Sequence, residues 1–510
     1  MPLFDVPARA GRIQDTALLK KTRTAKRTAS AGIKKGNGIL GRIAEIKAIV
    51  ETNLGQYRDE YEVIQNKDLL HEYITDCIGN SYISIDTETD GLNVYQNQIA
   101  GICIYTPNQK GAYIPLNHIS YVTGVKVENQ LPIGFVVDEF NRMLVKNPDI
   151  DMFNANFDIR VLRRINMSNI YCTWDGYLAS RILNENEPHK NLKDLHNKYC
   201  LNGQGDAFRF DDLFKGIPFT QIPIQTGYLY AAHDPVITTE LCEYQRKHLR
   251  ADSDREDIRA MYDVFMNIEM PCVSVVCDME DAGIKLDLDY AHELSVKYNA
   301  LLEDKVKTFN EMCATYYKEI HDYRVKHENV KLDDPINIGS PSQIAILLYD
   351  ILKLEHPDGA GARGTGEPVL QKIDHPIAKA ILEYREVSKL ISTYIDKLPQ
   401  CVESDGRIHC NFNQYGADTG RFSSSDPNLQ NIPSHNKEIR KMFVATNEEK
   451  LVSTDTQQFE VDRWCEVECA DEWKCADKII VGDELLLDDG SCVNVCGISV
   501  NKDKVVIDFT

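Results

Sequence analysis

The stretch from Thr419 to Glu460 constrains this chain most, because turn-forming and polar residues occur there in a dense, ordered pattern. It reads TGRFSSSDPNLQNIP from Thr419 to Pro433, and the apolar run Leu451-Val452-Ser453 follows, just ahead of Asp455. The pattern predicts a strand that ends at a carboxylate. Such a carboxylate either holds Mg²⁺ against phosphate oxygens or only caps the end of the strand.

This order of residues closely resembles the start of the palm of family A DNA polymerases, TGRLSS-x-x-PNLQNIP followed by D-Y-S-Q-I-E-x-R. Here the second part reads DTQQFE from Asp455 to Glu460. The resemblance implies that Asp455 is a metal ligand and that Arg421, Gln430 and Asn431 contact the backbone or minor groove of a DNA primer-template. Arginine suits phosphate and base-edge acceptors, and amides suit minor-groove contacts.

Composition sets broad limits. A length of 510 residues predicts three or four domains, at roughly 100 to 200 residues each. The net charge of −21 argues at first against a nucleic-acid partner, because phosphate contacts need Lys and Arg. The negative net charge does not exclude a nucleic-acid partner. A basic DNA-binding channel can be local, and the carboxylate clusters that metal-dependent nucleases need lower the total charge. The 15 Cys are scattered, which indicates reduced thiols.

No stretch approaches about 18 consecutive apolar residues, and the N-terminus lacks the apolar core of a signal peptide. We therefore expect no membrane association and a cytoplasmic protein, in the host cytoplasm if a phage encodes it. Residues 1–60 are expected to form a basic flexible tail, with Lys20, Lys21 and Arg23 among its charges. Such a tail is either only solvated or contacts DNA non-specifically. Nothing in it resembles a 5′ nuclease domain.

Three spaced motifs follow between residues 61 and 250. The β-rich run Tyr82–Ile85 leads into Asp86 and Glu88, which a strand would place on one side. Two close carboxylates are costly unless a cation neutralises them. We expect an antiparallel meander to continue through 98–105 and 111–116. Asn154 and Asp158 lie one helical turn apart, and Tyr230 and Asp234 repeat that spacing.

Taken together and in this order, the motifs resemble the 3′-5′ exonuclease superfamily, whose fold is ribonuclease H-like α/β. The resemblance implies a two-metal site for Mg²⁺ or Mn²⁺, with Asp86, Glu88, Asp158 and Asp234 as ligands and Tyr230 orienting the attacking water. Leu229 stands where the histidine-type branch has its base, so the tyrosine type is favoured. His233 and Asn154 are assigned supporting roles. Asp175 also matches the family pattern, and Lys190 and Lys193 are assigned either to a helix surface or to substrate contact.

Residues 251–400 read as helices and resemble the thumb of family A polymerases. One helix is predicted to close on Gly283, and the next to run from about Asp289 to Tyr317. Its apolar residues at helical spacing are predicted to be core: Leu294, Tyr298, Leu301, Leu302, Val306 and Phe309. The Gly-rich stretch 359–366 is interpreted as a flexible loop, since its glycine spacing does not match a phosphate-binding loop. Residues 401–464 would begin an α+β palm.

After Glu460 the polymerase resemblance breaks off. The family expects Arg two residues later, but Asp462 stands there, and residues 465–510 read as a small all-β segment. The stretch from Trp473 to Asp483 resembles the early part of an intein. The resemblance implies an N-terminal split-intein fragment in which Cys465 is the nucleophile. Alternatives are a divergent β extension or a zinc site at Cys469, Cys475, Cys492 and Cys496.

The first functional hypothesis is therefore the N-terminal half of a family A DNA polymerase with a proofreading 3′-5′ exonuclease. Under this hypothesis the exonuclease acts on single-stranded 3′ ends, and polymerisation would need a second chain that carries the complementary intein half. The second hypothesis, from another class, is a DNA-binding or polymerase-assembly subunit with no catalysis of its own. Hydrolysis of DNA in Mg²⁺ or Mn²⁺ distinguishes the two.

Overall fold

The computed structural model describes residues 38–446, apart from 81, 190, 206–209, 215, 360, 417–419 and 434–435, and beyond these the backbone of strands between Gln457 and Phe509. The chain divides into two compact units. One comprises the residues up to Gly283 together with Ala291–Arg440, and the other comprises Ile284–Tyr290 and Lys441–Thr510. The basic residues of positions 1–37, Asp455 and Cys465 lie outside the described residues.

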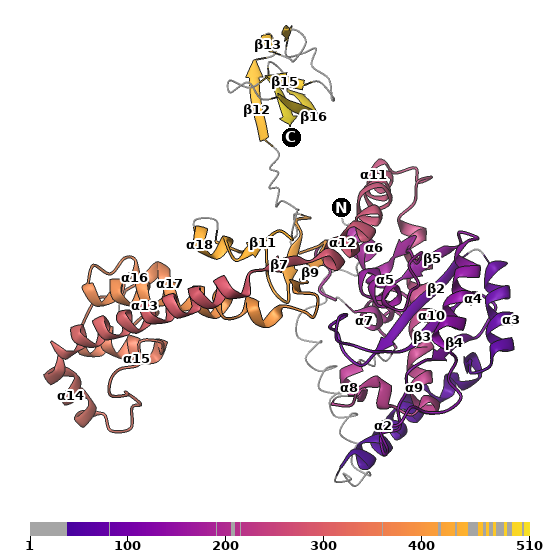
Figure 1. Ribbon diagram of the computed structural model, residues 1–510, viewed down its shortest axis with the longest axis horizontal. Coiled ribbons are helices and arrows are strands. Elements are labelled where there is room, and N and C mark those ends of the chain that lie inside the picture. Colours follow the sequence, from indigo (N-terminus) through magenta and orange to yellow (C-terminus); the bar gives the residue numbers. More distant parts are fainter. Residues whose placement is uncertain are drawn as a thin grey trace. The chain divides into compact units, whose positions relative to one another are not determined.

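The first unit contains a mixed six-stranded sheet in the order β1-β4-β3-β2-β5-β6 (Figure 1). β2, β3 and β4 form the predicted antiparallel meander, and β5 and β6 continue the sheet in parallel. β1 pairs with β4 in parallel. The strands are β1 (Tyr61–Val63), β2 (Tyr82–Thr89), β3 (Ile99–Tyr105), β4 (Gly111–Pro115), β5 (Asp149–Met152) and β6 (Trp174–Asp175).

Alternation along β2 separates the two faces of this sheet. Ile83 and Ile85 join the apolar cluster that α3 and α4 cover. Ser84 lies on the other face, where its hydroxyl is 2.6 Å from that of Thr239 in α10, and Asp86 and Glu88 share that face by the same period of two.

The helices of this region are α3 (Lys67–Ile78), α4 (Ile133–Leu144), α5 (Ala155–Arg164), α6 (Gly176–Leu183), α7 (Leu192–Tyr199), α8 (Phe210–Phe214), α9 (Ile224–Ala231) and α10 (His233–His248), with the 3-10 turn η2 (Phe219–Gln221).

The predicted flexible tail is wrong for residues 39–60. Helix α2 (Ile39–Leu54) and the 3-10 turn η1 (Gly55–Glu60) occupy this stretch. Ile43, Ile46, Val50 and Leu54 of α2 are buried in a cluster with residues of α8 and α9. Their spacing of three or four residues is that of one helix face. The basic composition around this stretch obscured that apolar pattern.

A mainly helical region follows, with a core of its own. Phe309, Ile344, Leu347 and Ile381 are fully buried in it. Its elements are α11 (Glu256–Val264), η3 (Phe265–Glu269), α12 (Met270–Ala282), α13 (Leu288–Ala314), α14 (Tyr317–Lys326), α15 (Pro341–Ala345), η4 (Ile346–Ile351), α16 (Glu367–Leu370), α17 (Pro376–Leu390), η5 (Ile391–Ile395) and η6 (Leu398–Cys401). The predicted cap is present, since Gly283 ends α12 at a φ of 55°. The prediction of Leu301 as core is wrong: it is 38% exposed on α13.

Among the described residues, the helical run Glu256–Ala282 is long and apolar enough to cross a membrane by length and composition alone. One such run is weak evidence for a membrane span, because core helices of soluble proteins have the same properties. Phe265, Val273 and Cys277 from this run are buried in the apolar cluster of the six-stranded sheet.

The segment after the helices is built of short elements. The predicted turn at Asp405 is present, with its side chain accepting from the N–H of Arg407 at 3.0 Å, and β8 (Arg407–Ile408) follows. β9 (Asn411–Asn413) pairs antiparallel with β10 (Ser423–Ser425), and α18 (Lys437–Arg440) completes this part of the first unit.

In the second unit, β7 (Ile284–Leu286) pairs antiparallel with β11 (Phe443–Val444). A four-stranded sheet has the order β12-β17-β16-β15, and β13 pairs with β14. These strands are β12 (Gln457–Asp462), β13 (Glu466–Glu468), β14 (Trp473–Cys475), β15 (Glu484–Leu486), β16 (Cys492–Asn501) and β17 (Lys504–Phe509). Because β12 precedes Cys465, this sheet begins in the sequence before the boundary predicted at residue 465.

Candidate active site

Strand β2 supplies the first two carboxylates of the site. Asp86 and Glu88 project from the same face of the strand into a cavity of 1090 Å³. Burial raises the pKa of Asp86 well above its usual range, and the charges of Asp158, Asp234 and Glu88 raise it further. Burial likewise raises the pKa of Glu88. Both groups therefore need a nearby positive charge to stay ionised.

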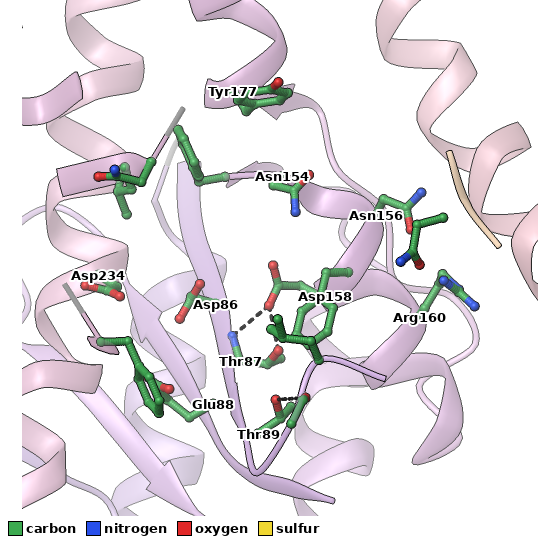
Figure 2. Close-up of a pocket in the computed structure, with 18 of the residues that line it drawn as sticks. Asp86, Thr87, Glu88, Thr89, Asn154, Asn156, Asp158, Arg160, Tyr177 and Asp234 are labelled. Carbon is green, nitrogen blue, oxygen red and sulfur yellow. Dashed lines mark hydrogen bonds between the residues drawn. The ribbon is translucent and has the colours of Figure 1, made fainter. Parts of the chain in front are cut away.

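Helix α5 supplies Asp158, and β2 holds it in place. The backbone N–H and the hydroxyl of Thr87 both donate to Oδ1 of Asp158, at 2.8 and 2.6 Å (Figure 2). Burial nevertheless raises the pKa of Asp158 to about 7. Thr87 lies between the two carboxylates of β2 in sequence, so one strand both carries two acidic groups and orients a third.

Asp175 fixes the start of α5. Its carboxylate accepts from the N–H groups of Asn154 and Ala155 at 3.1 and 2.8 Å, and it also caps α6 through Tyr177 at 2.8 Å. Asn154 itself adopts a left-handed backbone with a φ of 63° immediately before the helix, a conformation that Asn tolerates better than most residues. Through these contacts Asp175 links the start of α5 to the start of α6.

Tyr230 and Asp234 come from two consecutive helices. Tyr230 lies near the end of α9 and Asp234 in the first turn of α10, with Ala232 at the junction. Both line the same cavity as Asp86, Glu88 and Asp158. Burial raises the pKa of the Tyr230 hydroxyl well above its usual range, so this group stays protonated and can donate a hydrogen bond.

His233 has a structural environment. Its Nδ1 is 2.6 Å from the Tyr61 hydroxyl, and its ring stacks on Tyr57 from η1 at a centroid distance of 5.7 Å. Burial lowers the pKa of His233 to about 3, so the ring is neutral and cannot act as a cationic group near neutral pH. The supporting role expected of His233 is consistent with these contacts.

The structure places Lys193 in the site, whereas the sequence alone did not decide between a helix surface and a contact with substrate. Its Nζ is 2.7 Å from Oδ1 and 2.8 Å from Oδ2 of Asp234, and it donates to the Tyr230 hydroxyl at 2.8 Å. It also lies 3.9 Å from the centroid of the Tyr230 ring. The positive charge of Lys193 lowers the pKa of Asp86, Glu88 and Asp234 against the effect of burial.

The donor set fits hard divalent cations. Carboxylate oxygens are the ligands that Mg²⁺ prefers, and Asp86, Glu88, Asp158 and Asp234 all reach the cavity (Figure 2). Within the described residues, no hydrogen bond or ion pair reaches the carboxylate of Glu88, although it is only 7% exposed. A buried carboxylate without a protein partner is expected where a cation completes its environment. Asp86, Glu88 and Cys103 offer ligand atoms within 4.8 Å of one another.

The residues expected to contact DNA lie on a loop. Ser424 Oγ accepts from the N–H groups of Leu429 and Gln430, both at 3.1 Å, and Asn428 accepts from that of Asn431 at 3.1 Å. The side chains of Arg421, Gln430 and Asn431 are exposed, as a contact with DNA requires. Asp455 and Cys465 cannot be placed, because they lie outside the described residues.

Two regions of the sequence match known families. Residues 61–250 match the family described as 3′-5′ exonuclease, and residues 303–465 match DNA polymerase family A. The two matched regions of this chain are thus similar to the exonuclease and polymerase parts of family A DNA polymerases. The six-stranded sheet lies within the region that matches the 3′-5′ exonuclease family, and so does the site described above.

Relatives of this chain include two bacterial DNA polymerases. DNA polymerase I of Chloroflexus aurantiacus is 32% identical over 396 residues, which are 74% of this chain and 38% of that protein. DNA polymerase I of Synechocystis sp. is 33% identical over 393 residues, 74% of this chain and 36% of that protein. The chain thus spans less than two fifths of the length of either relative.

A solved structure shares the fold. The polymerase domain of Pol1 from M. smegmatis, in complex with DNA primer-template and dNTP, superposes with a TM-score of 0.56 at 21% identity. The match covers 77% of this chain and 59% of that one. At this level of identity the likeness concerns the fold alone.

Proposed function

We propose that this chain hydrolyses DNA from single-stranded 3′ ends, as the proofreading exonuclease of a family A DNA polymerase. The observation that carries the proposal is the convergence of Asp86, Glu88, Asp158, Asp234 and Tyr230 on one cavity from four separate elements of the exonuclease domain. A convergent cluster of buried carboxylates with raised pKa values is typical of a catalytic site.

Divalent cations, when bound, would supply Lewis acidity and a more acidic water. Asp86, Glu88, Asp158 and Asp234 would hold them. Thr87 keeps Asp158 in place, and the protonated Tyr230 hydroxyl would orient the attacking water. The water oxygen would form a bond to the phosphorus of the last phosphodiester while the bond from that phosphorus to the 3′ oxygen of the preceding nucleotide breaks. The water gives up one proton to solvent, the freed 3′ oxygen takes up one proton from solvent, and the last nucleotide is released as a nucleoside 5′-monophosphate.

The experiment incubates the full chain with a 5′-labelled single strand in Mg²⁺ or Mn²⁺ and follows shortening from the 3′ end. Asp86→Ala should abolish shortening. The matched control is Asp138→Ala, which removes an exposed carboxylate from α4 on the opposite side of the sheet. Tight binding of primer-template without hydrolysis in either metal would instead favour the alternative, a DNA-binding or polymerase-assembly subunit.

We propose further that Asp455 is a metal ligand of the polymerase site and that Arg421, Gln430 and Asn431 contact primer-template. The family A match over residues 303–465 and the exposure of the three side chains support this. Substitution of Arg421 by Ala should weaken primer-template binding, measured by fluorescence anisotropy. A cytoplasmic location stays a prediction.

Residues 465–510 are proposed to be an intein-like segment, with Cys465 as its nucleophile. The family A match ends at residue 465, and the backbone beyond it forms strands β13 to β17. Splicing would join the residues before Cys465 to the remaining palm and fingers, supplied by a second polymerase chain or by a continuation of this one. Mass spectrometry after co-expression with the complementary half tests this: a joined product should form, and Cys465→Ala should prevent it.

A further inference from the structure

The cavity that contains the carboxylates has one wall from a distant part of the chain. The carboxylates lie in the region that matches the 3′-5′ exonuclease family. Asn411, Phe412 and Asn413 of β9 line the same cavity, and they lie in the region that matches DNA polymerase family A. Both parts belong to the same compact unit. The metal ligands and Tyr230 leave β9 without a part in the proposed hydrolysis.

Glu280 ties this wall to the helix that carries Asp158. It lies near the end of α12, between the two matched regions, and its side chain is 2% exposed. Its carboxylate accepts from the guanidinium of Arg160 on α5 and from the backbone N–H of Phe412 on β9. Its carbonyl oxygen lies 2.7 Å from Nδ1 of His409, just ahead of β9. Glu280 therefore contacts both α5 and the segment that contains β9.

Arg160 is as deeply buried as Glu280. Its side chain is 3% exposed, and its Nε also donates to the carboxylate of Asp281 at 2.8 Å. It follows Asp158 by two residues on α5, and both line the cavity (Figure 2). The ordinary interpretation is a structural ion pair, but such a pair is often no more stabilising than apolar side chains of the same volume. Its more specific consequence is the geometry that it fixes, with β9 held against α5.

We propose that Glu280 and Arg160 are positioning residues of the exonuclease, which hold β9 so that Phe412 contacts an unpaired base of the single strand. The inference rests on the proposed function and deepens it. Phe412 is only partly buried although it lines the cavity. An aromatic side chain can stack on any base, which suits an enzyme that shortens strands of any sequence. Such stacking changes affinity by roughly fivefold to a hundredfold.

The first test measures kcat and KM for hydrolysis of a 5′-labelled single strand by the full chain. Phe412→Ala should raise KM at least about fivefold and leave kcat within about twofold, whereas Phe412→Tyr keeps the ring and should restore the native KM. The double variant Arg160→Met with Glu280→Met replaces the ion pair by apolar side chains of similar volume and should raise KM by a similar factor. Because the pair acts through Phe412, adding Phe412→Ala to this variant should raise KM no further.

Arg163→Met is the matched control. Arg163 lies on the same helix and pairs with Asp278 and Asp281 of α12 at 2.8 and 3.3 Å, but it is not among the contacts that hold β9. Its replacement should leave KM unchanged. A fall in kcat in the double variant, or effects of the pair and of Phe412 that add, would show that the pair acts on Asp158 or on the fold alone. Either result would overturn the proposal.

Crosslinking separates the proposal from the exonuclease assignment. A single strand with iododeoxyuridine near its 3′ end, and with a phosphorothioate as its last linkage to slow hydrolysis, is irradiated with the full chain in Mg²⁺. Mass spectrometry should find the strand on the peptide that contains Phe412. A native chain that hydrolyses DNA but gives no such crosslink would overturn the contact. A native chain that gives the crosslink but hydrolyses no ordinary strand would uphold the contact and overturn the exonuclease assignment alone.

Discussion

Lys193 Nζ lies 2.7 Å from Oδ1 of Asp234, inside the group of carboxylates that are proposed to hold the catalytic metals. Both side chains are nearly buried, with 11% and 12% of their area exposed. An ion pair of this kind is sheltered from solvent screening, so breaking it leaves a buried charge without compensation. Lys193 is therefore suited to stabilise negative charge in the site, and it also competes with a cation for Asp234.

Replacement of Lys193 by Met should separate these two effects. The maximal rate of exonuclease hydrolysis should fall about tenfold to a hundredfold, because a positive charge is lost where negative charge develops. The Mg²⁺ concentration for half-maximal rate should fall as well, because Asp234 is released. Rates measured against Mg²⁺ concentration check both. Lys247→Met, an exposed change on α10, should alter neither.

The hydroxyl of Thr87 should matter for rate more than for stability. Thr87→Val removes its 2.6 Å hydrogen bond to Asp158 but keeps the one from the backbone. The hydrogen bond is worth about 1 kcal/mol, so hydrolysis should slow by roughly fivefold to tenfold. Thr87→Ser retains the hydroxyl and should restore most of the rate. Equal rates in the two variants would show that Asp158 does not need this contact.

The stability of the metal-free protein should depend on pH through the buried carboxylates. Burial raises the pKa of Asp158 from 3.8 to about 7, so the folded state binds more protons than the unfolded state between these values. The contribution of Asp158 to stability is present below about pH 4 and is lost as the pH rises through about 7. In a chelator, the melting temperature should fall across this window, and Asp158→Asn should reduce the fall. Mg²⁺ should stabilise the protein more at pH 8 than at pH 5.

Helix α2 should be required for the stability of the exonuclease domain. Ile46 is fully buried against residues of α8 and α9, and α9 carries Tyr230. Ile46→Ala should lower the free energy of unfolding by about 2 to 5 kcal/mol, measured by denaturant titration. Lys47→Ala on the exposed side of the same helix should change it by less than about 0.5 kcal/mol. Equal effects would contradict the packing of α2.

The sequence predicted those site residues whose relation is local. Asp86 and Glu88 share a face because a strand alternates, and Asp158 stands one turn from Asn154 at the start of α5. Lys193 could not be assigned in this way, because its contact with Asp234 depends on how α7 packs against α10. The position of Cys103 opposite Asp86 depends on the register between β2 and β3. This register cannot be inferred from the spacing of neighbouring residues in the sequence. The buried residues of helix α2 follow a helical period, but the charged residues among and before them give the stretch the composition of a solvated tail.

The difference between local spacing and packing between elements also explains why the prediction of Leu301 as a core residue is wrong. Its spacing on α13 is that of a buried residue, but which turns of a long helix are covered depends on the neighbouring helices, and Leu301 is 38% exposed. Asp455 and Cys465 rest on resemblance alone, since they lie outside the described residues.

The most direct test of the account is single-turnover hydrolysis of a 5′-labelled single strand by the full chain and by Asp86→Asn combined with Glu88→Gln, in Mg²⁺. These changes keep the shape of the side chains but remove two charges that would hold the metals. Loss of several kcal/mol of transition-state stabilisation predicts a rate at least about a thousandfold lower, with shortening from the 3′ end by the native chain only. Hydrolysis by the double variant within about tenfold of the native rate would contradict the metal-dependent exonuclease site.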